Sequence, residues 1–109
     1  MSAEGVQVHT NGGEARRLVP LGDGLIDWLR QDDDVRAGTF VYKLAEAAGP
    51  HPIEVGASET VLVLSGRIRF EPAGGPALEL GPGEAISFER GARGAWSLVE
   101  DTELFFVAT

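Results

Sequence analysis

Short stretches in which apolar and polar residues alternate fill much of the chain. Residues 67–71 alternate cleanly, with Ile68 and Phe70 on one face and charged residues on the other. A period of two residues is that of a β-strand with one buried face. Four further segments are predicted to be strands, three by the same alternation and the last by its apolar character: 39–45, 84–88, 95–99 and 103–108.

Glycine- and proline-rich turn signals separate the predicted strands. From Gly66 onward these signals recur at the short spacing that is typical of a β-sandwich or β-barrel. No segment between them is long enough for an amphipathic helix. Residues 25–29 fit either a strand or one helical turn, and residues 32–34 read as an acidic turn. The pattern therefore predicts an all-β domain.

The segment 60–65 carries apolar residues on both faces, so both faces should be covered. One face would look into the interior of a barrel, and the other carries Leu62 and Leu64. Two covers fit the sequence: residues 6–30 of the same chain, or a second subunit. The second cover makes a homodimer the expected assembly.

The first third of the chain is predicted to be a separate layer. Residues 6–9 and 17–20 read as short edge strands. We therefore divide the chain into N-terminal strands at 1–37, which cover the barrel or a dimer interface, and a barrel core at 38–109.

Composition narrows the function classes. The 109 residues suffice for one domain, and the absence of cysteine excludes disulfides and thiolate metal sites. The formal net charge of −8 disfavours nucleic acid and anionic membranes, which need clustered Lys and Arg, and favours a neutral or cationic ligand. No signal peptide and no membrane-spanning apolar run is visible, so a cytoplasmic location is expected.

Two glycine-bounded motifs carry a family resemblance. The first is Glu59 followed by six residues and Gly66, and the second runs from Gly83 to Gly91 and continues through Gly94 to a tryptophan. In order and spacing they resemble single-domain cupins, in the subfamily of the ethanolamine-utilisation cupin and ureidoglycine aminohydrolase-like domains. The resemblance implies a cupin-type jelly-roll barrel of two antiparallel sheets, with a ligand pocket at its centre.

The chain departs from metal-binding cupins at the metal ligands. Those cupins place a His-x-His pair shortly before the glutamate, where this chain has Pro52 and Glu54 or the residues beside them, and their last histidine falls on Gly94. The chain holds only two histidines, His9 and His51. We therefore expect no cofactor, and a divalent metal held by atypical ligands is the disfavoured alternative.

Glu59 is the first candidate for chemistry, because the resemblance turns its carboxyl group toward the barrel interior. A carboxyl group there suits a general acid or base. The catalytic candidates are Glu59, His51 and Tyr42, and the expected ligand contacts are Glu54, Lys43, Trp96 and Phe88. For most of these residues a plain structural role competes: a loop at the barrel mouth for His51 and Glu54, core packing for Tyr42 and Trp96, and solvent for Lys43.

The expected function is binding of a small organic molecule in the barrel, extended by metal-independent acid–base chemistry on a small polar metabolite. Three alternatives stay open: a non-catalytic sensor or accessory domain, a small cupin nucleoside phosphorylase, and a metal-dependent cupin with atypical ligands. The phosphorylase needs an anion site inside the barrel. It fails if four arginines all face solvent: Arg67, Arg69, Arg90 and Arg93. The ligand itself is not identified by the sequence.

Overall fold

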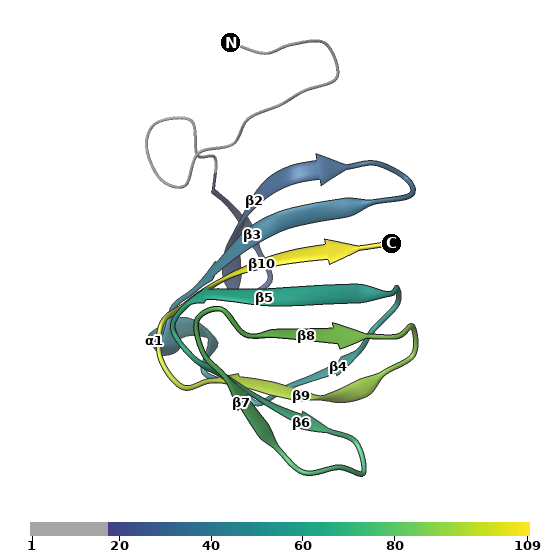
Figure 1. Cartoon of the computed structure of the whole chain (residues 1–109). Helices are drawn as coiled ribbons and strands as arrows, with labels where there is room; N and C mark the ends of the chain where they lie inside the picture. Colours follow the sequence, from purple (N-terminus) through teal and green to yellow (C-terminus); the bar gives the residue numbers. More distant parts are fainter. Residues whose placement is uncertain (1–17) are drawn as a thin grey trace.

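A computed structural model of the chain describes residues 18–109, which form two antiparallel β-sheets that face each other (Figure 1). The larger sheet has the strand order β1 (Val19–Leu21), β2 (Gly24–Gln31), β3 (Arg36–Tyr42), β10 (Thr102–Ala108), β5 (Glu59–Ser65) and β8 (Ala85–Phe88). The smaller sheet has the order β4 (His51–Glu54), β9 (Arg93–Leu98), β6 (Ile68–Pro72) and β7 (Leu78–Leu80). Two facing antiparallel sheets are the arrangement that the family resemblance implied.

The two inner faces supply the core. The predicted alternation of residues 67–71 is confirmed, since Ile68 and Phe70 are 6% and 5% exposed and their neighbours lie outside. One cluster of buried residues includes Ile26 and Phe106 of the larger sheet. A second cluster includes Val63 and Ile68 and draws residues from both sheets. Burial of these side chains is the main force that holds the sheets together.

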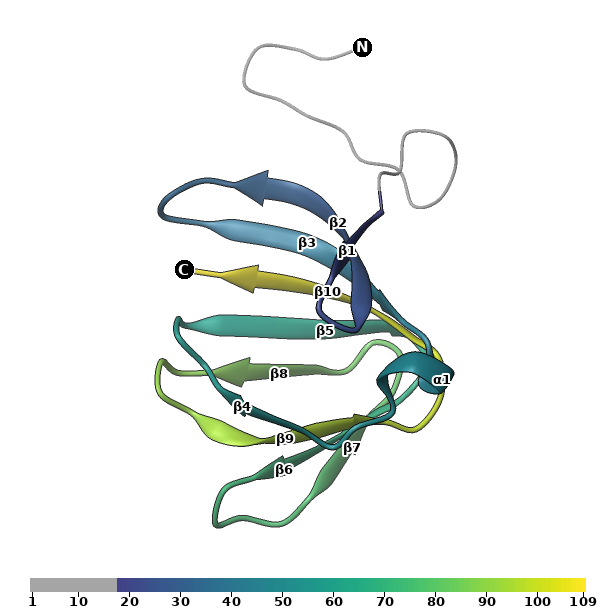
Figure 2. The same cartoon turned by 180° about the vertical axis from the view of Figure 1, so that it is seen from behind.

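One predicted strand is shorter than expected. The segment 39–45 was predicted to be extended throughout, but β3 ends at Tyr42 and Leu44–Ala47 forms the single helical turn α1. The backbone N–H of Leu44 donates to Oδ1 of Asp101 at 2.7 Å, which holds the start of the turn. Ala47 is buried against the core, so the turn also closes one end of the barrel where β3 passes to β4 (Figure 2).

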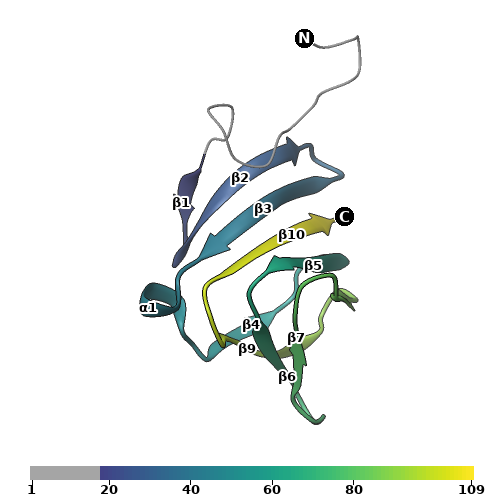
Figure 3. The ribbon, with the colours of Figure 1, turned by 60° about the vertical axis from the view of Figure 1, so that its left-hand side comes forward.

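The undecided segment 25–29 is a strand, because it lies within β2 and pairs with β3. β1 and β2 extend the larger sheet at its edge, as the oblique view in Figure 3 shows, and do not lie across its outer face. Residues 18–31 therefore leave Leu62 half-buried and Leu64 41% exposed. The predicted strand at 6–9 and residues up to 17 lie outside the described part. The division placed between residues 37 and 38 falls inside β3.

Candidate functional site

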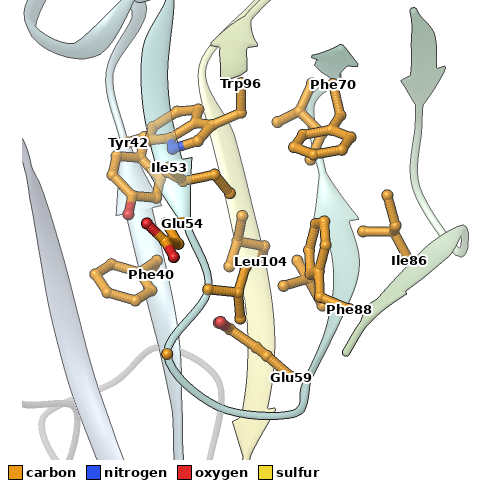
Figure 4. Close-up of a pocket in the computed structure, with 14 residues that line it drawn as sticks. Phe40, Tyr42, Ile53, Glu54, Glu59, Phe70, Ile86, Phe88, Trp96 and Leu104 are labelled. Atoms are coloured by element: carbon orange, nitrogen blue, oxygen red, sulfur yellow. The ribbon is translucent and has the colours of Figure 1, made fainter. Parts of the chain in front are cut away.

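The space between the two sheets contains a cavity of about 270 Å³ (Figure 4). Its walls are mainly apolar and aromatic, and they come from both sheets and from the loop after β4. Fourteen residues line it: Phe40, Tyr42, Ile53, Glu54, Val55, Gly56, Glu59, Val61, Ile68, Phe70, Ile86, Phe88, Trp96 and Leu104. A concave, largely apolar site with a few polar groups is the usual form of a small-molecule site.

Glu59 reaches this cavity from the first position of β5. It lies on the same face as Val61, and in the register it stands directly opposite Phe88 of β8. Burial raises the pKa of the Glu59 carboxyl group above its usual value of 4.5, and the Arg36 guanidinium offsets part of this effect. The carboxyl group therefore keeps its proton to a higher pH than an exposed glutamate does.

Tyr42 faces the same cavity from the end of β3, among other rings. It stacks on Phe40 with ring centroids 5.2 Å apart and meets Trp96 of β9 at 5.0 Å. Burial raises the pKa of the Tyr42 phenol, and the charges of Glu59 and Asp23 raise it further. The phenol therefore stays protonated and can donate one hydrogen bond.

His51 does not line the cavity, although β4 carries it on the same face as Ile53. Its ring lies against that of Trp96, with centroids 4.3 Å apart and planes tilted by 31°, and Nε2 donates to the carbonyl oxygen of Ala47 at 2.9 Å. Nδ1 lies 3.7 Å from Oδ2 of Asp23. The structure therefore does not bring His51 together with Glu59 in the cavity lining, and these contacts hold it behind Trp96 at the α1 end.

Lys43 also lies outside the cavity lining. β3 ends before it, and its Nζ lies 3.9 Å from Oδ2 of Asp101 among solvent-exposed groups. The structure brings three of the four expected ligand contacts to the cavity, namely Glu54, Trp96 and Phe88. Glu54 reaches it from the exposed side, where Oε1 lies 3.5 Å from the Arg93 guanidinium.

The described lining does not fit a cupin metal site. Within residues 18–109 no three His, Asp or Glu side chains gather where they could hold an ion. The cavity wall offers two carboxyl groups, Glu54 and Glu59, and no histidine. Divalent transition metals in such folds need more nitrogen or oxygen ligands than these. His9 lies outside the described residues.

The four arginines that an internal anion site would need are all exposed, and none lines the cavity: Arg67, Arg69, Arg90 and Arg93. The phosphorylase alternative therefore loses the site on which it depended. The sequence interpretation also missed two lining rings, Phe40 and Phe70. Alternation along a strand indicates which side chains share a face, but it does not separate packed core from cavity wall.

The α1 helix, the only helix among residues 18–109, is too short to cross a membrane. No match was found among curated proteins. Several solved structures share the fold. An RmlC-like cupin from Shewanella frigidimarina has a TM-score of 0.75 at 12% identity, over 94% of this chain and 90% of that chain. A Rhizobium leguminosarum protein of unknown function gives 0.67 at 17% identity, over 81% and 82%.

The putative ethanolamine utilization protein Q of Salmonella typhimurium gives a TM-score of 0.66 at 15% identity, over 78% of this chain and 68% of that chain. At such identities, likeness to these structures shows the fold alone. The sequence shows the family as well as the fold, because the family model of the EutQ-like cupin domain matches residues 34–103, more than half of the chain. The chain therefore belongs to the EutQ-like cupin domain family.

Proposed function

We propose that this protein binds a small organic molecule inside the barrel and that Glu59 is the polar group around which the ligand is oriented. The observation that carries the proposal is the cavity of about 270 Å³ with one half-buried carboxyl group in an apolar and aromatic wall. A buried polar group without a hydrogen-bonding or charged partner costs folding free energy, and a bound ligand can supply that partner.

Acid–base chemistry is the second part of the proposal. Burial raises the pKa of the Glu59 carboxyl group, so this group keeps its proton to a higher pH than an exposed glutamate does and can give it up and take it back as a general acid or base. Tyr42 supplies a protonated phenol on the same cavity and can hold a developing negative charge by donating a hydrogen bond. The proposed reaction needs no metal, and the alternative is a sensor or accessory domain that binds without turnover.

The test is a metabolite screen read by thermal shift on three proteins: wild type, Glu59→Gln and Glu89→Gln. Glu89 is exposed, follows Phe88 in the chain and does not line the cavity, so its variant controls for loss of one acidic group. A ligand that stabilises wild type and Glu89→Gln, and Glu59→Gln less, supports the site. A ligand that stabilises all three proteins equally places binding elsewhere and refutes the assigned site.

Turnover separates an enzyme from a sensor once a ligand is found. An enzyme would convert the ligand and lose most of the rate in Glu59→Gln, because general acid–base groups contribute about 10²–10⁴-fold. A sensor would return the ligand unchanged after long incubation with wild-type protein.

A cytoplasmic location belongs to this proposal, since a chain without cysteine suits a reducing compartment.

We also propose that two copies pair through the outer face of the larger sheet. Leu25 and Val41 are neighbours on that face, as are Leu62 and Phe105, and Leu64 is 41% exposed beside them. Contiguous apolar surface of this kind is common at protein interfaces. Sedimentation velocity of wild type and a charged outer-face variant, Leu62→Glu, tests this pairing.

A dimer that dissociates in Leu62→Glu supports the pairing. Leu78→Glu is the matched control, because Leu78 is 40% exposed on β7 in the smaller sheet. A wild-type protein that sediments as a monomer at all concentrations refutes it.

A further inference from the structure

The charged groups that line the cavity are of one sign. Glu54 and Glu59 are the two charged side chains of the lining, and Lys, Arg and His are absent from the fourteen lining residues. Two cations among the described residues act on these carboxyl groups from outside the lining: Arg93 pairs with the exposed side of Glu54, and Arg36 acts on Glu59 from β3. An anionic ligand would therefore enter the cavity without a counter-charge, which is costly in a low-dielectric site.

Aromatic rings make up a large part of the wall on both sides of the cavity. Phe40, Tyr42 and Trp96 lie together on one side in Figure 4, while Phe70 and Phe88 lie on the other. The second pair meets edge to face with centroids 5.1 Å apart. The face of an aromatic ring carries partial negative charge and attracts a cation within about 6 Å of its centre.

The carboxyl group and one ring are direct neighbours in the sheet. Glu59 and Phe88 are register partners on β5 and β8, and Val61 and Ile86 form the next pair on the same face. Side chains that oppose each other in this way have Cβ atoms about 4.5–5.5 Å apart. A small cation beside Glu59 would therefore also lie next to the Phe88 ring, so one position offers both kinds of attraction.

From these observations we infer that the barrel selects a small organic ammonium ion, with its nitrogen beside Glu59 and its carbon atoms among the aromatic rings. This inference rests on the proposed binding function and names the ligand class of that same site. The raised pKa of Glu59 is consistent with it, because burial disfavours a carboxylate that a bound cation would stabilise. The cavity volume equals that of roughly nine water molecules, which suits a metabolite with few heavy atoms.

The experiment measures calorimetric affinities for four probes of nearly equal shape. Choline and protonated 3,3-dimethylbutylamine are cations, 3,3-dimethylbutan-1-ol is the neutral isostere of choline, and 3,3-dimethylbutanoate is an anion. We expect at least one cation to bind about tenfold more tightly than the neutral alcohol, a difference of about 1.4 kcal/mol. We expect the anion to bind most weakly.

Three variants locate the preference. Glu59→Gln should reduce the ratio of cation to alcohol affinity toward one, whereas the exposed control Glu89→Gln should keep it. Phe88→Leu retains apolar volume but removes the ring, so it should weaken cation binding several-fold and leave the alcohol nearly unchanged. Near-ultraviolet and far-ultraviolet circular dichroism of each variant confirms that the fold is kept.

Each result has a defined meaning. If the neutral alcohol binds as tightly as both cations, the preference for ammonium is overturned and the proposed binding function still stands. Tighter binding of the anion overturns it as well. If none of the four probes binds at millimolar concentration, the ammonium inference fails, while the binding function is judged separately by the metabolite screen. A cation preference that persists in Glu59→Gln also overturns the inference, because the carboxyl group would not be its source.

Discussion

The glycine that ends the first cupin motif allows a sharp test of how the fold is held. Gly66 lies in the turn after β5 with φ +87°, a left-handed conformation that side chains with a Cβ rarely adopt. A Cβ built on it would overlap the carbonyl oxygen of Asp101 and lie 2.5 Å from Oγ1 of Thr102. The substitution Gly66→Ala therefore adds a steric conflict to a backbone conflict.

The steric conflict falls on a site with little room to move. Thr102 is 2% exposed, and its hydroxyl group donates to the carbonyl oxygen of Glu100 at 2.9 Å and accepts from the N–H of Arg67 at 3.2 Å. Any shift that relieves the new Cβ must disturb these bonds or the backbone that carries them. Overpacking of this kind costs about 1–3 kcal/mol.

Gly83→Ala is the matched control. Gly83 has φ +84°, but a Cβ there would meet nothing within 4 Å, so its variant carries the backbone cost alone. That cost is about 1–2 kcal/mol, and the sum for Gly66→Ala is about 2–5 kcal/mol. The entropy that alanine removes from the unfolded chain is similar at both positions and cancels in the comparison.

Equilibrium urea unfolding of wild type and both variants measures the difference. We expect Gly66→Ala to lose more unfolding free energy than Gly83→Ala by about 1–3 kcal/mol, with a correspondingly lower melting temperature of roughly 4–8 °C per kcal/mol. Equal losses in the two variants would refute the reasoning, because the contact with residues 101 and 102 would then cost nothing. The motif glycine would in that case be needed only for its backbone conformation.

Three further predictions concern titration and packing. The folded pKa of Glu59 lies above its usual value of 4.5, so the stability that this group contributes is present below that value and is lost as pH rises through the folded pKa. Glu59→Gln should therefore gain unfolding free energy relative to wild type as pH rises above about 4.5 in urea titrations. A difference that stays constant as pH rises would contradict the burial of the carboxyl group. Tyr42 is the single tyrosine, so near-ultraviolet absorbance should show phenolate forming only above the usual pKa of 10.0. Circular dichroism confirms that the chain is still folded at that pH. A midpoint at the usual value would place the phenol in solvent. Ile26→Ala removes a side chain that is 0% exposed and should cost about 2–5 kcal/mol of unfolding free energy in the same assay. Leu78→Ala, at a site 40% exposed, should cost less than about 1 kcal/mol. Similar losses in the two variants would mean that Ile26 is not part of the core.

Much of the barrel could be predicted from residue alternation and turn spacing. The family resemblance turned Glu59 inward, on the same face of β5 as Val61, and the motif that ends in Trp96 predicted a ring that lines the cavity from β9. Alternation predicts the face of each side chain reliably in strands, because a register shift of one residue would move every side chain to the opposite face of the sheet. The family resemblance supplied the two-sheet arrangement that alternation alone does not give.

The rest depended on contacts between distant residues. Lys43 was placed on a strand, but the chain leaves β3 before it, and the helical turn that follows is held by a carboxylate 57 residues later. His51 shares a face of β4 with the lining residue Ile53, yet its hydrogen bond to Ala47 and its ring contact with Trp96 hold it away from the cavity. Pairwise contacts across the fold of this kind leave no periodic signal in the sequence.

The short strand β1 has a consequence for how copies of this chain meet. It is three residues long, and its central residue, Pro20, has no N–H to offer to another strand. It pairs with residues 24–26 of the eight-residue strand β2, so this part of the sheet edge is closed to a neighbouring chain. Growth of the larger sheet from molecule to molecule is thereby discouraged at this side. Two copies that met through the faces of the larger sheet, as proposed above, would close on each other and form no open-ended fibre.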